Sequence, residues 1–372
     1  MALRDIIGQD KSVNILLRTI QRGRLPSSYL FAGESGIGKK FTAINLAKAL
    51  NCLKTTPTLA LPPRGGGMSG GDSELLTQID ACDECFSCKK IESGSHPDFL
   101  VISPEGGQIR VEEIRATDNI LSFKPFEGRK KVVIVDEADT MNPFASNAFL
   151  KTLEEPPKDS LIILISSNPD RLPDTIKSRC SRVNFTPLSI ESCRKVIETV
   201  SSRQSAPPPI PPPRGGRVRE GVAAPNRRTS ELPNSQTISL LVRLSMGRPG
   251  LAFTGNLVEE RAWCIKLLKG MLDAEKDGWT SKEEMERWFD LVLILFRDMA
   301  IIKIARDETN LVNIDLKDYL NKLSRSMDLK VIIENYQKLS ALKGYLNFNL
   351  NRSLTWNYAG SLLRKTMGII YA

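Results

Sequence analysis

The stretch Gly33-Glu34-Ser35-Gly36-Ile37-Gly38-Lys39-Lys40 (GESGIGKK) decides the expected fold. Its glycine, four residues, glycine and lysine follow the spacing of a phosphate-binding loop. An apolar run at 29–32 precedes it, and apolar residues recur at helical spacing over 40–50. A strand, a glycine loop and a helix N-terminus together present backbone N–H groups to phosphates. We therefore expect a nucleotide site, rather than a chance glycine-rich turn, at Gly33, Gly36, Gly38, Lys39 and Lys40.

The last position of this loop departs from the pattern. Phosphate-binding loops carry Ser or Thr after the lysine, and that hydroxyl holds Mg²⁺. This chain has Lys40 there, which lacks the hydroxyl and whose ammonium repels the ion. The loop thus has the parts that cradle a nucleotide and lacks one that hydrolysis requires, so binding of ATP or ADP stays open.

Length and composition predict a soluble chain of two or three domains. The 372 residues have ordinary hydrophobic content, and the net charge of +9 is compatible with nucleic acid or acidic protein partners. The longest apolar run, 291–296, is far too short to cross a bilayer, and the N-terminus does not resemble a signal peptide. Seven cysteines in such a chain favour reduced thiols or a metal site. We expect a cytoplasmic location and no membrane.

Four cysteines form a candidate metal site. Cys82, Cys85 and Cys88 are spaced C-x₂-C-x₂-C, and Cys52 precedes them. Four thiolates are the ligand set of a structural tetrahedral Zn²⁺ site, so we expect zinc here rather than ordinary buried cysteines. The fourth ligand is open between Cys52 and His96, the only histidine, for which a structural role before Pro97 is the better interpretation.

Two stretches, 61–67 and 207–216, share the motif Pro-Pro-Arg-Gly-Gly. Proline- and glycine-rich segments cannot build a core, so both are expected to be disordered inserts or linkers that folding does not require. Arginines in and around the second stretch could touch nucleic acid, although a solvated loop is the simpler interpretation.

Short apolar runs at 99–102, 132–135 and 161–165 alternate with helical segments. This alternation predicts a parallel sheet with helices on both faces, whose ligands lie beyond the carboxyl ends of the strands. Asp136, Glu137 and Ser166 follow such runs beside the glycine loop. Paired acids at a strand end favour a Mg²⁺ ligand and a water-orienting base over two solvated acids. After Pro187 the pattern is helical, with an apolar stripe from Met285 to Met299 typical of a bundle core.

Several of these motifs resemble the bacterial clamp-loader subunits, a branch of the AAA+ proteins. They are NAFLKTLEEPP at 147–157, Ser178-Arg179-Cys180, DEAD at 136–139, and the four cysteines. The resemblance is strong over about the first 190 residues and weak over the helical remainder. Lys40, the GRPG run at 247–250 and the short helical ending resemble the delta-prime type, whereas ATP-hydrolysing gamma/tau subunits keep a hydroxyl residue at position 40.

The resemblance implies a fold and its boundaries. It implies an α/β AAA+ P-loop domain, with a parallel sheet, helices on both faces and an inserted zinc module, followed by an all-α lid and an all-α collar domain. The boundaries are 1–187, with the module at about 52–90, then 188–255, with an insert at about 204–235, and 256–372.

The resemblance also implies partners and site residues. The partners are gamma/tau and delta subunits, in a ring that loads the sliding clamp onto primer–template DNA. Arg179 is expected to reach into a neighbour's nucleotide site, where a guanidinium stabilises charge on the transferred phosphoryl group; the alternative is a surface arginine. Arg248 matches the lid arginine that contacts nucleotide in active members.

Three functional hypotheses follow. The first is a non-hydrolysing scaffold subunit that activates its neighbours, and the second is a gamma-like ATPase motor. The third, more remote, is a zinc-dependent nucleic-acid binder that uses the cysteine cluster. An ATPase assay separates the first two, and a gel shift tests the third.

Overall fold

The structure is a computed structural model that describes residues 2–54, 80–204, 235–254, 257–274, 278–305, 310–348 and 350–367. Both Pro/Gly-rich stretches lie outside these residues. The chain divides into two compact units, residues 1–195 with 247–250 and residues 196–246 with 251–372. The expected division into three domains therefore stays a prediction.

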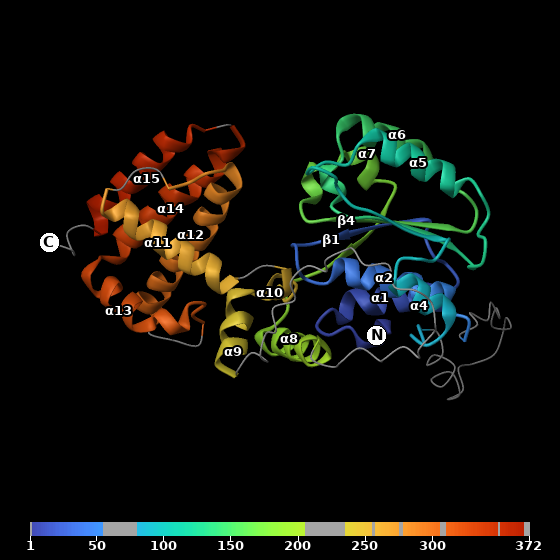
Figure 1. Cartoon of the computed structure of the whole chain (residues 1–372), viewed down its shortest axis with the longest axis horizontal. Helices are drawn as coiled ribbons and strands as arrows, with labels where there is room; N and C mark the ends of the chain where they lie inside the picture. The colour runs from blue at the N-terminus through green and yellow to red at the C-terminus, as the bar shows by residue number, and fades with distance from the viewer. Residues whose placement is uncertain are drawn as a thin grey trace, which may run out of the picture. The chain divides into compact units, whose positions relative to one another are not determined.

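The first unit contains a five-stranded parallel sheet (Figure 1). Its order is β2-β3-β4-β1-β5. The strands are β1 (Ser28–Ala32), β2 (Phe99–Ile102), β3 (Lys131–Val135), β4 (Ser160–Ser166) and β5 (Ser181–Asn184). Strands β1, β3 and β4 are buried along their whole length, as expected of parallel strands covered on both faces. In register, Ala32 pairs with Ser166 and Val135 with Leu164, so the ends of β1, β3 and β4 meet at one edge.

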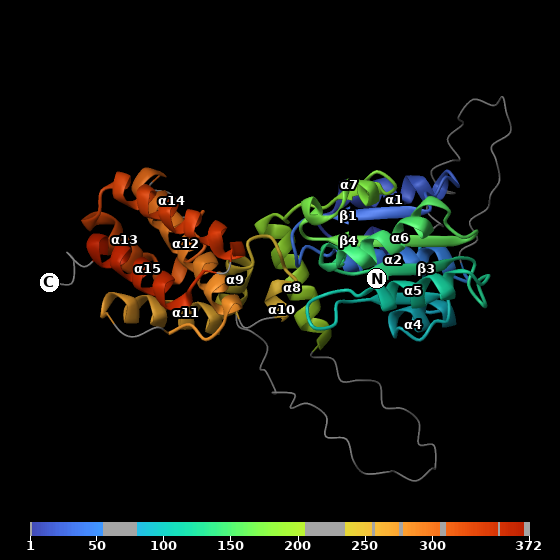
Figure 2. The same ribbon diagram turned by 90° about the horizontal axis from the view of Figure 1, so that it is seen from above.

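Helices cover both faces of this sheet (Figures 1 and 2). On one face lie α1 (Asp10–Gln21), α2 (Lys39–Asn51) and α4 (Phe86–Glu92), and on the other lie α5 (Val111–Leu121), α6 (Pro143–Glu154) and α7 (Asp174–Lys177). Helix α6 begins where the Asn142 side chain accepts the Ala145 N–H at 2.7 Å, with Pro143 in the first turn. Its Phe149 packs with Val133 and Leu164 in the core of that face.

Five short 3₁₀ turns and helix α8 (Ile190–Gln204) connect the elements of the described chain. The turns are η1 (Leu3–Asp5), η2 (Ala138–Thr140), η3 (Pro169–Arg171), η4 (Ile314–Leu316) and η5 (Leu346–Phe348). Helix α8 runs from the first unit into the second. The predicted α/β sheet followed by an all-helical remainder is thus confirmed.

Helices are the only regular secondary structure among the described residues of the second unit. Its helices are α9 (Ser235–Leu244), α10 (Leu251–Thr254), α11 (Leu257–Leu272), α12 (Lys282–Ala305), α13 (Lys317–Ser326), α14 (Leu329–Tyr345) and α15 (Arg352–Met367). The predicted stripe on α12 forms its core, where Trp288 is fully buried and packs edge-on against Trp279 at 5.3 Å. None of the helices that the structure describes is long and apolar enough to cross a membrane.

One charged residue of α12 contradicts the simple pattern. Asp298 lies off the apolar stripe in sequence, yet it is fully buried. Its carboxylate accepts the backbone N–H groups of Val312 and Asn313, at 3.2 and 2.8 Å, and the Asn313 side-chain amide at 2.9 Å. Burial is tolerated because these donors satisfy the carboxylate, which therefore fixes the turn after α12.

Candidate nucleotide-binding loop and metal centre

The glycine loop connects β1 to α2, as its sequence predicts. Gly36 and Gly38 have φ angles of 81° and 98°, which side chains disfavour. A Cβ atom on Gly33 would lie 2.5 Å from the carbonyl oxygen of Phe185, so only glycine fits there. The backbone therefore has the shape of a phosphate cradle, with the N-terminus of α2 at its end.

Lys39 is folded back onto this loop. Its ammonium donates to the carbonyl oxygens of Gly33 and Glu34, at 2.5 and 2.6 Å, and the residue is 5% exposed. Burial lowers the pKa of Lys39 from 10.5 to about 8, although nearby carboxylates, that of Asp136 first, oppose the shift. The cation that would bind phosphate is thus held by acceptors of its own loop.

The lowered pKa of Lys39 predicts a pH dependence of stability. The folded protein releases this proton near pH 8, whereas the unfolded chain keeps it to about 10.5. The unfolded state therefore binds more protons between these values, and stability should rise with pH there relative to a Lys39→Met variant. Urea unfolding of both proteins from pH 7.5 to 10 measures the difference. A difference in unfolding free energy that does not change with pH would contradict the lowered pKa of Lys39. The control is Lys11→Met, which replaces an exposed lysine of α1.

Lys40 forms an ion pair with Asp136, one of the two acids expected from the sequence to serve a Mg²⁺ site. Its Nζ lies 2.9 Å from Oδ2 of Asp136, just beyond β3, and that carboxylate is only 18% exposed. Asp136 Oδ1 also accepts the backbone N–H of Glu137 at 3.1 Å. Glu137 has a φ of 49°, in the left-handed region, and precedes η2. The structure thus brings Lys40 and Asp136 together, with the ammonium paired to the carboxylate.

Ser166 lies beneath the loop. It is fully buried, its hydroxyl accepts the Asn168 N–H at 3.1 Å, and its carbonyl accepts the Gly33 N–H at 3.3 Å. Ser167 donates its N–H to Asp139 at 3.1 Å. Ser166 therefore supports the backbone of the loop.

The segment Gly247–Gly250 packs against the glycine loop within the first unit. The Gly250 N–H donates to the Gly36 carbonyl at 2.8 Å, and a Cβ on Gly250 would lie 2.9 Å from Gly36 Cα. Arg248 lies 3.3 Å from the Glu34 carboxylate. Sequence reasoning placed Arg248 near the nucleotide site, but it missed these backbone contacts because about 200 residues separate the two segments.

Arg179 lies between α7 and β5. One guanidinium nitrogen, Nη2, is 2.6 Å from Oε1 of Glu154, and Nη1 donates to the Thr175 carbonyl at 2.8 Å. The Arg179 side chain is 35% exposed. Its contacts are therefore on α6 and α7 of its own chain, and about a third of the side chain is exposed.

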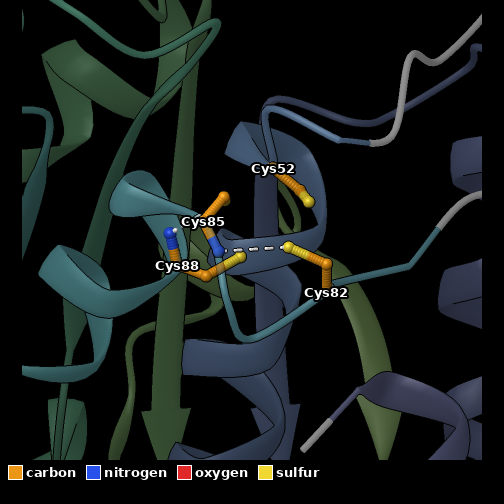
Figure 3. Close-up of side chains that lie close together, drawn as sticks. All are labelled: Cys52, Cys82, Cys85 and Cys88. Atoms are coloured by element: carbon orange, nitrogen blue, oxygen red, sulfur yellow. Dashed lines mark hydrogen bonds between the residues drawn. The ribbon is translucent and has the colours of Figure 1, made fainter.

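The four cysteines lie together (Figure 3). Their Sγ atoms are all within 4.8 Å of one another, and Cys52 and Cys88 are buried. Tetrahedral Zn²⁺ with Zn–S bonds of about 2.3 Å places sulfurs about 3.8 Å apart, so the cluster fits zinc after a small contraction. The N–H groups of Cys85 and Cys88 point to the sulfurs of Cys82 and Cys85, at 3.4 and 3.5 Å. These bonds favour the thiolate form that a metal requires.

His96 has a different environment. Its Nδ1 accepts the backbone N–H of Asp98 at 3.1 Å, and the residue is buried. Burial lowers the pKa of His96, which favours a neutral ring. Of the two candidates for the fourth ligand, Cys52 is the one that lies with the other cysteines.

A buried lysine ties this cysteine cluster to the P-loop helix. Lys48 of α2 is 3% exposed and pairs with Asp83, at 3.1 Å, and with Glu92 of α4. Cys52 itself caps the C-terminal end of α2. The cluster is therefore fastened to the same helix whose other end begins the phosphate loop.

The fold and the loop define an α/β protein with a P-loop-like turn between β1 and α2. Residues 8–61 and 73–189 match the family described as DNA polymerase III, delta subunit. The delta' subunit of DNA polymerase III from Bacillus subtilis (strain 168) is 30% identical over 311 residues, which cover 81% of this chain and 79% of that protein. The chain belongs to the delta-prime family of DNA polymerase III clamp-loader subunits.

Other relatives match shorter regions. The delta' subunit from Pseudomonas aeruginosa is 37% identical over 161 residues, or 43% of each chain. The tau subunit from Escherichia coli (strain K12) is 32% identical over 200 residues, which cover 54% of this chain and 28% of tau. A solved structure of a gamma subunit-related protein from Thermotoga maritima covers 95% of this chain and 99% of its own, with 17% identity and a TM-score of 0.39.

Proposed function

We propose that this clamp-loader subunit does not hydrolyse ATP itself and instead supplies Arg179 to the nucleotide site of a neighbouring ATPase subunit. The observation that carries the first half is the ion pair between Lys40 and Asp136. Mg²⁺ needs the carboxylate that Lys40 occupies, and the hydroxyl that would be its other ligand is absent.

Electrostatics supports the exclusion of Mg²⁺. Two like unit charges about 4 Å apart repel by roughly 4 kcal/mol at an effective dielectric constant of about 20, and Mg²⁺ carries two charges. For the ion to bind, Lys40 would have to leave Asp136. Hydrolysis needs Mg²⁺ to neutralise charge on the β- and γ-phosphates, so the loop lacks a central part of that chemistry.

The other cations around the loop support the same proposal. Lys39 is held by two loop carbonyls, and Arg248 is paired with Glu34. Both of these cationic side chains thus have an acceptor within the chain. A bound nucleotide would have to replace these contacts, which disfavours tight binding.

The isolated chain should therefore show negligible ATPase activity, and any nucleotide binding should depend little on Mg²⁺. Lys40→Thr should make binding more dependent on Mg²⁺ without restoring turnover, because the neighbouring arginine is missing. Phosphate release and calorimetric titration with and without Mg²⁺ measure both. Robust Mg²⁺-dependent turnover by the unmutated chain would overturn the proposal and favour a gamma/tau-like motor.

Two further assignments rest on the family. We propose that Zn²⁺ bound by the four cysteines is structural, because all four ligands are thiols and a closed set leaves no position for a substrate. We also propose gamma/tau and delta subunits as neighbours, with the sliding clamp and primer–template DNA as targets of the complex in the cytoplasm. Co-purification with these subunits tests the partners.

A further inference from the structure

The ion pair between Arg179 and Glu154 carries the next inference. Its Nη2–Oε1 separation is 2.6 Å, and the Thr175 carbonyl holds the second terminal nitrogen at 2.8 Å. The two acceptors come from different helices, Glu154 from the end of α6 and Thr175 from α7. Together they fix both the position and the plane of the guanidinium.

The position of Glu154 points to a purpose other than helix stability. It is the last residue of α6, where the helix dipole is negative and disfavours a carboxylate. Glu155 follows directly, which adds a second negative charge at the same helix end. The Arg179 guanidinium is the cation that compensates Glu154 there.

We infer that Glu154 is a positioning residue that holds Arg179 in the orientation needed to reach a neighbour's phosphoryl group; this inference rests on the proposed role of Arg179. A guanidinium has five N–H donors, and the contacts to Glu154 and Thr175 engage two of them. Within the described residues the other three donors make no hydrogen bond, and the side chain is 35% exposed, so they are available to phosphate oxygens. Without Glu154, the long side chain keeps its charge and loses its fixed direction.

The test uses the complex reconstituted with its partner ATPase subunits. Glu154→Gln should lower kcat at the site that receives Arg179 by about 10- to 100-fold, as expected for a displaced catalytic group, and leave KM unchanged. Glu155→Gln is the matched control and should retain the wild-type rate. An exposed ion pair adds little stability, so the melting temperature of Glu154→Gln should stay close to that of the wild type.

A double-mutant cycle separates the possible outcomes. If Glu154 acts through Arg179, the Arg179→Ala, Glu154→Gln double variant should be as slow as Arg179→Ala alone. Additive losses, a wild-type rate for Glu154→Gln, or a faster rate would each overturn the positioning role. If Arg179→Ala itself leaves hydrolysis unchanged, the proposed role of Arg179 is wrong. That outcome differs from the ones above, which reject only the positioning role of Glu154.

Discussion

Replacing Arg179 with alanine should slow ATP hydrolysis at the receiving site of the assembled complex by on the order of 10³- to 10⁵-fold. In the proposed role, the guanidinium stabilises the charge that spreads over the phosphoryl oxygens in the transition state. Arg179 is 35% exposed and bonded to α6 and α7, so its loss should leave the fold and assembly intact. A pre-steady-state measurement of phosphate release should show this effect as the loss of one fast kinetic phase.

Arg182 provides the control for this experiment. It lies three residues further on, in β5, and its Nε donates to Asn184 at 2.7 Å. Arg182→Ala removes the same charge from the same region, so it should retain the fast phase. Arg179→Ala with unchanged phosphate release and normal assembly would show that the arginine acts elsewhere.

Loss of the cysteine cluster should produce the second large effect. A metal bound by Cys52 and Cys82 closes a loop of about 30 residues. A cross-link over such a loop contributes about 4 kcal/mol by the chain-entropy estimate, and the metal bonds add to this. Cys85→Ser removes one of the four thiols, so it should weaken metal binding, open this loop and lower the melting temperature of the first unit by about 10 °C or more. Differential scanning calorimetry measures the change.

Metal content is the companion measurement. Elemental analysis should find about one zinc per chain in freshly purified, reduced wild-type protein, and much less in Cys85→Ser. Cys180→Ser is the control, because Cys180 packs with the core of the α5 and α6 face and is not part of the cluster. Absence of metal from the wild-type protein, or an unchanged melting temperature after chelation, would contradict the assignment.

Apolar runs predicted four of the five strands, because a strand buried on both faces leaves a continuous signal. The runs at 99–102 and 132–135 match β2 and β3 within one residue. Strand β5 was missed since its sequence, Ser-Arg-Val-Asn, buries only Val183. It lies at the edge of the sheet, where backbone pairing with β1 and not side-chain burial defines the strand.

The candidate sites were predictable where motif and local spacing coincide. The loop glycines and the three clustered cysteines follow from sequence, whereas the partnership of Cys52 needed the structure, since about 30 residues separate it from Cys82. The sequence predicted that the charge of Lys40 disfavours Mg²⁺ binding. Only the structure showed that this charge is paired with Asp136. Glu154 gave no signal, because a glutamate at a helix end is recognisable only from the cation that it faces.

The ion pair of Lys40 bears on how the stability of this chain responds to the ATP level of the cell. A protein whose loop binds nucleotide at 100 times its Kd gains about 2.7 kcal/mol of stability from that ligand, and loses it when the ligand is depleted. In this chain the cations around the loop are paired within the polypeptide. Their partners are the carboxylates of Asp136 and Glu34 and two loop carbonyl oxygens. On the proposal that this loop does not bind nucleotide tightly, the folded population of this chain should stay constant when ATP falls during starvation.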